Sequence, residues 1–99
     1  MKNISNIEIK RRAQQDLANI EKYISKDSKF YADKTIFEIK ERILNLLHFP
    51  EMGKQIEIDG KIVRQIIYKA YRIFYQINSN NIYILSVFHH SRDISNLKF

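Results

Sequence analysis

The chain has 99 residues, 44% of them apolar, which leaves room for one domain around a single core. It has no cysteine, which excludes disulfide scaffolds, thiolate metal sites and cysteine nucleophiles. Residues 1–60 carry 11 basic and 10 acidic side chains, whereas residues 61–99 carry six basic side chains and one acidic side chain. Most of the net charge of +6 therefore lies in residues 61–99, where it would attract phosphates or acidic protein.

The first 25 residues predict a short strand followed by an amphipathic helix. Residues 4–9 have a strand pattern, with Ile7 and Ile9 on one face. The apolar period then changes to that of a helix, and we expect its stripe to lie in the core. This stripe consists of Ala13, Leu17, Ile20, Tyr23 and Ile24. The helix is expected to stop near residues 25–28, which contain several caps for a next helix.

A second helix is predicted up to about His48, and it is apolar over an unusually wide surface. One stripe consists of Ile36, Ile39, Ile43, Leu46 and Leu47, and a second of Phe30, Phe37 and Leu44. This width predicts that both stripes are core, packed on the first helix and on a sheet. Pro50 and Gly53 end the helix, and the short connection between the helices makes them an antiparallel hairpin.

After Gly53 the pattern is that of strands. The predicted strands are residues 54–58, 62–68, 71–77 and 82–89. They are separated by a strong hairpin turn at residues 59–60, a weak turn at residues 69–70 and a clear turn at residues 78–81. The predicted fold class is therefore α+β: one domain over residues 1–99, with an N-terminal strand, an antiparallel helix hairpin and an antiparallel β-meander.

This order of elements, together with three local motifs, resembles the RelE/ParE toxin superfamily. The first motif is Ala13-x-x-Asp16-Leu17-x-x-Ile20-x-x-Tyr23-Ile24, and the second is Pro50-x-x-Gly53 followed by Arg64. The third and most specific is Tyr71-Arg72-Ile73-Phe74-Tyr75 followed by Ile84-Leu85-Ser86-Val87-Phe88-His89-His90-Ser91-Arg92-Asp93. Together the motifs span almost the whole chain.

The resemblance implies a plasmid-stabilisation type of protein, the toxin of a type II toxin-antitoxin system. Its partner would be a small acidic antitoxin that wraps it with a helix or an extended segment. RelE-like members are endoribonucleases that cut mRNA in the ribosome, whereas ParE-like members arrest growth by binding DNA gyrase. A third possibility is a detoxified descendant that binds nucleic acid with the same fold.

For RNA cleavage the resemblance points to three residues. Arg64 matches the strand arginine that contacts the scissile phosphate, and its planar fork suits that role. His89 and His90 match a His-Tyr pair, and His89 could serve as the general acid or base. The set departs from the family pattern: His90 replaces the tyrosine, the lysine-rich set is not recognisable, and Glu51 is about one residue out of register. The His-x-Ser-Arg-Asp ending is more like that of ParE, which favours gyrase binding.

Other cations are candidates for contacts with the target or with nucleic acid. They are Lys61, Lys69, Arg72 and Arg92. Each candidate also has a structural interpretation: Arg64 could be a solvated strand arginine or an antitoxin contact, the two histidines could cap the last strand, and Arg92 could pair with Asp93. Several tyrosines could stack on bases, although tyrosines in a meander are usually core.

No cofactor or metal site is predicted. The first twelve residues lack the long apolar core of a signal peptide, and no apolar run approaches the roughly 18 residues that a membrane span requires. With the absence of cysteine, these features predict a cytoplasmic protein with no membrane partner.

Overall fold

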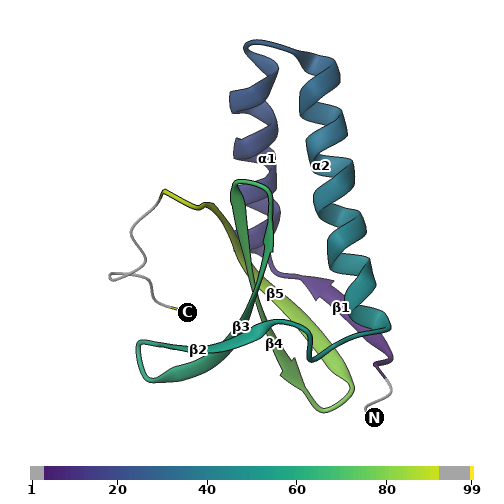
Figure 1. Ribbon diagram of the computed structural model, residues 1–99, viewed down its shortest axis with the longest axis vertical. Helices are drawn as coiled ribbons and strands as arrows, with labels where there is room; N and C mark the ends of the chain where they lie inside the picture. The colour runs from purple at the N-terminus through teal and green to yellow at the C-terminus, as the bar shows by residue number, and fades with distance from the viewer. Residues whose placement is uncertain (1–3, 92–98) are drawn as a thin grey trace.

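The computed structural model describes residues 4–91 and 99 and contains a helix hairpin packed on one five-stranded sheet (Figure 1). The strands are β1 (Asn6–Ile9), β2 (Lys54–Ile58), β3 (Lys61–Tyr68), β4 (Tyr71–Asn78) and β5 (Asn81–His89). The helices are α1 (Arg11–Ser25) and α2 (Lys29–Leu44), and a 3-10 turn, η1 (Asn45–Leu47), follows α2. The predicted α+β fold class is confirmed, and the far end of the hairpin projects beyond the sheet (Figure 1).

The sheet has the order β1-β5-β4-β3-β2. The four strands after the hairpin form an antiparallel meander, as predicted. The first strand pairs in parallel with the last, with Ile7 opposite Ile82 and Ile9 opposite Ile84. The first and last strands are therefore neighbours in the sheet, a pairing that requires the long connection made by the hairpin and the meander.

The turns follow from local residue chemistry. Asp59 and Gly60 have φ angles of 52° and 79°, the two positive values that a tight hairpin between twisted strands requires. Lys69 and Ser79 occupy the left-handed region in the other two turns, with φ of 51° and 57°. The hydroxyl of Ser28 accepts a hydrogen bond of 3.1 Å from the backbone N–H of Tyr31 and so caps the start of α2.

Each face of the sheet has its own apolar cluster. The helix face is the larger, and Ala13 and Leu17 of α1 and Ile36, Ile39 and Ile43 of α2 are buried against it. The opposite face holds a smaller cluster formed by Ile58, Val63, Phe74 and Phe88. Strands covered on both faces explain why the sequence after Gly53 is apolar at consecutive positions.

The prediction that both stripes of the second helix are core was wrong for the whole second stripe and for Leu47 of the first, which is 38% exposed. Phe30, Phe37 and Leu44 are 77%, 62% and 51% exposed, because α1 and the sheet cover only the other side of α2. Tyr23, expected in the core stripe of the first helix, is 72% exposed. These side chains therefore provide apolar surface rather than core packing.

Asp16 joins α1 to the edge of β5. The paired part of β1 ends at Ile9, opposite Ile84, so the next stretch of β5 has a strand, β4, on one edge only. There the Oδ2 atom of Asp16 accepts hydrogen bonds from the Ser86 hydroxyl, at 2.5 Å, and from the Val87 backbone N–H, at 3.0 Å. The carboxylate thus replaces the missing strand partner, which accounts for an aspartate in the first motif.

Candidate functional site

Arg64, the central candidate from the sequence, binds the turn that follows α2. It is half-buried on β3, and its Nη1 atom donates to the carbonyl oxygens of Glu51, at 3.0 Å, and Gly53, at 2.7 Å. The neighbouring hydroxyl of Tyr75 donates to the Pro50 carbonyl, at 2.7 Å, and accepts from the Gly53 N–H, at 2.9 Å. Burial raises the pKa of Tyr75, so the hydroxyl remains a donor at neutral pH.

The same contacts explain the second motif. A Cβ atom at Gly53 would lie 2.6 Å from the hydroxyl oxygen of Tyr75 and 2.7 Å from its Cε1 atom, so only glycine allows the turn to approach the ring. Pro50 supplies the carbonyl, Gly53 the close approach, and Arg64 the second set of donors. In this structure the motif therefore fixes the connection between helix and sheet.

His89 and His90 lie at the end of β5. The Nδ1 atom of His89 is 2.8 Å from the Ser91 hydroxyl, and its ring meets that of Tyr71 edge to face, with centroids 5.6 Å apart. The backbone N–H of His90 donates to the Ala70 carbonyl at 2.6 Å, and its Nδ1 atom lies 3.2 Å from the same oxygen. Since a carbonyl oxygen only accepts, this contact places the His90 proton on Nδ1.

The strand register separates these histidines from Arg64. Arg64 pairs with Tyr75, whereas His89 pairs with Tyr71. The two positions on β4 are four residues apart, about 13 Å at roughly 3.3 Å per residue, and β3 and β5 flank β4 on opposite sides. The structure therefore does not bring Arg64 and His89 together.

The other predicted cations are also dispersed. Lys61 begins β3 and donates to the backbone oxygen of Phe99, whereas Lys69 lies in the turn after β3 and pairs with Glu38 at 3.4 Å. Arg72 is half-buried on β4, where it lies between Ile67 and Phe88 in the register. Arg92 falls outside the described residues. Lys61 and Lys69 are thus at opposite ends of one strand and do not form a single patch.

Glu38 links α2 to the turn between β3 and β4. Its carboxylate accepts a hydrogen bond from the Tyr68 hydroxyl, which lowers the pKa of Glu38, and the nearby Lys69 ammonium lowers it further. Burial and then the bond to Glu38 raise the pKa of Tyr68. The guanidinium of Arg42 and the ammonium of Lys69 lie 5.6 and 5.4 Å from the centre of the Tyr68 ring. This tyrosine therefore has a structural role.

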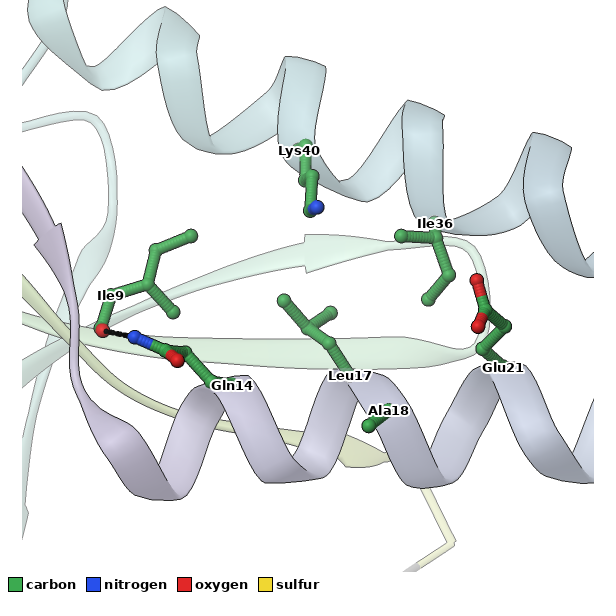
Figure 2. Close-up of a pocket in the computed structure, with 7 residues that line it drawn as sticks. All are labelled: Ile9, Gln14, Leu17, Ala18, Glu21, Ile36 and Lys40. Atoms are coloured by element: carbon green, nitrogen blue, oxygen red, sulfur yellow. Dashed lines mark hydrogen bonds between the residues drawn. The ribbon is translucent and has the colours of Figure 1, made fainter.

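Two hollows that the sequence did not indicate lie beside α1. One lies between the helices, where Leu17 and Ile36 form the floor and Glu21 and Lys40 stand on opposite sides (Figure 2). At its end, the side-chain amide of Gln14 donates to the Ile9 carbonyl at 2.8 Å. The other hollow contains Tyr23 and His89. Sequence periodicity missed the second hollow, because it assigned Tyr23 to the core.

Within residues 4–91 and 99, no group of three or more histidine, aspartate or glutamate side chains is arranged to hold a metal ion. No helix in that part of the chain is long and apolar enough to cross a membrane.

The family follows from a comparison over most of the chain. The model of the family described as ParE toxin of type II toxin-antitoxin system, parDE, matches residues 7–94. The chain belongs to the ParE toxin family. It is therefore a type II toxin, a class whose partner is an antitoxin.

Solved structures of toxin-antitoxin systems share the fold of this ParE-family chain. A chromosomal ParDE system from P. aeruginosa contains a chain 20% identical, with a TM-score of 0.75 over 89% of this chain and 98% of that one. The toxin-antitoxin complex RelBE2 from Mycobacterium tuberculosis contains one 15% identical, with a TM-score of 0.57 over 93% and 97%. No curated protein sequence matches this chain. At these identities the likeness shows the fold alone.

Proposed function

We propose that this ParE-family toxin arrests growth in the cytoplasm by binding DNA gyrase. The ParE side of the superfamily is the side that binds gyrase, and the family match falls on that side. The proposal makes the protein an inhibitor that acts through its surface, with no bond made or broken by its own side chains.

The observation that carries this proposal is the separation of the candidate nuclease residues. RNA cleavage requires a base near the 2′-hydroxyl, cations at the phosphate and an acid at the leaving oxygen, all within hydrogen-bond reach of one phosphodiester. Arg64 and His89 project from register positions about 13 Å apart along β4, on strands to either side of it. One phosphodiester does not span that distance.

The contacts of the two candidates support the same proposal. Arg64 already donates to two backbone carbonyls, and losing them would free the turn after α2. His90 is bonded to the β3–β4 turn through Ala70, the strand-capping role that is the structural alternative to catalysis. His89 keeps an exposed ring, which meets the ring of Tyr71 edge to face.

The exposed stripe of α2 is our proposed site for the antitoxin. Phe30, Phe37 and Leu44 recur every seven residues, so they lie almost in line along the helix. Such a line fits an amphipathic helix with apolar residues at the same interval. Replacing Phe37 with aspartate is expected to abolish protection by the co-expressed cognate antitoxin while leaving the growth arrest intact. Full protection of cells that express the variant would refute this assignment.

The test of the proposed function is a titration of the purified toxin into purified gyrase, ATP and relaxed plasmid. We expect loss of negative supercoiling, together with unchanged mRNA 3′ ends when the same toxin is added to a translating bacterial extract. New 3′ ends within codons and normal supercoiling would instead identify a ribosome-dependent nuclease. Activity in neither assay, with a folded protein, would identify a detoxified descendant.

A further inference from the structure

A second surface with apolar and aromatic side chains lies beside α1. A cavity of about 420 Å³ opens between the second half of α1 and the paired ends of β4 and β5. It is lined by Asn19, Ile20, Tyr23, Tyr71, His89 and Ser91, and we call it the aromatic cup. Its volume falls within the range of about 300–1,000 Å³ typical of binding pockets.

The shape of the aromatic cup favours a bulky apolar side chain over a nucleobase. Ile20 and Tyr71 are half-buried, and Tyr23 adds a largely exposed ring. The rings of Tyr71 and His89 meet at 89°, so they form two walls of a hollow rather than a parallel slot in which a flat base could stack. A compact anchor side chain is therefore the better fit.

Polar groups in the aromatic cup are available to an incoming segment. In the described part of the chain, no hydrogen bond engages the hydroxyl of Tyr71 or Tyr23. Burial raises the pKa of Tyr71, so its hydroxyl remains a donor. Together with the amide of Asn19, these groups could bind the backbone or polar atoms beside an apolar anchor.

The charge around the aromatic cup is positive. Lys22 is exposed on α1 and Lys26 is exposed directly after it, and the Nζ atom of Lys26 lies 5.8 Å from the centre of the Tyr23 ring. Neither lysine has a salt bridge among the described residues. The two acidic residues of α1 are directed elsewhere: Asp16 binds β5, and Glu21 lines the groove between the helices (Figure 2). The complementary surface is therefore an apolar anchor flanked by carboxylates.

We infer that the aromatic cup, with Lys22 and Lys26, is the surface that binds gyrase, through an acidic gyrase segment carrying one large apolar side chain. This inference rests on the proposed function and adds the binding site to it. The cup is compact and basic, whereas the stripe of α2 is long and has balanced charge, with Asp33 and Glu41 as well as Lys29 and Lys34 near it in the helix. The two surfaces therefore fit different partners.

The first test replaces the exposed anchor-binding ring. Tyr23→Ala should raise the toxin concentration needed for half-inhibition of gyrase supercoiling about tenfold, since central interface aromatics have effects of this size. Phe49→Ala is the matched control, because Phe49 is also a largely exposed aromatic but lies in the loop after η1. It should inhibit as the unmodified toxin does. Far-UV circular dichroism and thermal unfolding confirm that both variants are folded.

The second test reverses one charge and does not depend on an aromatic. Lys26→Glu should weaken inhibition several-fold at low salt, and the deficit should shrink as salt is raised, whereas Lys54→Glu on β2 should have little effect. If Tyr23→Ala and Lys26→Glu both inhibit like the unmodified toxin, the inference is wrong and the proposed function stands. If the unmodified toxin itself leaves supercoiling intact, both the inference and the proposed function are wrong.

Discussion

Asp16, a half-buried position on α1, should be highly sensitive for folding, because both groups that donate hydrogen bonds to it belong to buried residues. Ser86 is 0% exposed and Val87 is 2% exposed. In Asp16→Ala the Ser86 hydroxyl and the Val87 N–H lose their acceptor, at about 1–3 kcal/mol for each buried donor left unpaired. We therefore expect a loss of about 3 kcal/mol or more from a total stability of about 5–15 kcal/mol.

The geometry also predicts a mild variant at the same position. Both hydrogen bonds end on one atom, Oδ2 of Asp16, so the amide oxygen of Asp16→Asn can occupy that place and accept both. The asparagine variant loses only the additional strength that a charged acceptor gives to the two hydrogen bonds, which should cost about 1 kcal/mol of stability. Asp33→Ala serves as the control for removing a carboxylate: Asp33 is paired with Lys29 at 3.1 Å on the surface, and its loss should cost about 0.5 kcal/mol or less.

Urea unfolding followed by far-UV circular dichroism measures these differences, because the chain contains no tryptophan for fluorescence. A loss of 3 kcal/mol corresponds to a melting temperature lower by about 12–24 °C, at roughly 4–8 °C per kcal/mol for a domain of this size. Equal destabilisation by the asparagine and alanine variants would refute the reasoning, as would an alanine variant within about 0.5 kcal/mol of the unmodified protein.

Three further outcomes follow from the structure. Gly53→Ala should destabilise the fold by about 2 kcal/mol in urea unfolding, because its Cβ must displace the Tyr75 ring. Folding lowers the pKa of Glu38 below 4.5, so the carboxylate stabilises the fold above pH 4.5 and this contribution is lost as the pH falls through the folded pKa. Glu38→Gln should therefore flatten the decline in stability on the acid side. Phe37→Ala should change stability by about 0.5 kcal/mol or less, since the side chain is 62% exposed.

Each outcome has a matched comparison. Gly60→Ala adds a Cβ in open space and costs only the backbone strain of φ 79°, about 1 kcal/mol, so a larger loss there than at Gly53 would contradict the steric argument. Tyr68→Phe, which removes the hydroxyl that donates to Glu38, should flatten the acid-side slope as Glu38→Gln does; an unchanged slope would contradict the assignment. Ile39→Ala, at a fully buried position on α2, should cost about 2–5 kcal/mol; a similar loss at Phe37 would show that its stripe is packed.

Much of the local structure could be predicted because it is encoded over short distances. The apolar period changes from two to about 3.6 residues at the start of α1 and back after Gly53, and the helices and strands follow those changes. The Asp59-Gly60 turn is set by its own two residues, which adopt the positive φ angles that the hairpin needs. The family resemblance, carried by motifs spread along the whole chain, was also confirmed.

The candidate site was less predictable, because the identity of a side chain does not determine which group it contacts in the folded protein. The family resemblance suggested that Arg64 contacts phosphate. In the folded chain its guanidinium donates to the carbonyl oxygens of Gly53 and Glu51, which lie 11 and 13 residues before it. Its distance from His89 depends on the register of three strands, which no short segment determines.

Alone, the sequence determined the kinds of elements, their order and the turns between them, since each depends on residues close together in the chain. Tertiary structure decided which apolar faces are covered. Phe37 and Ile39 lie two positions apart on α2 and have similar hydrophobicity, yet one is 62% exposed and the other 0%. Periodicity reports that a helix has apolar faces, but only the packing of α1 and the sheet against α2 selects which of them becomes core and which remains free for a partner.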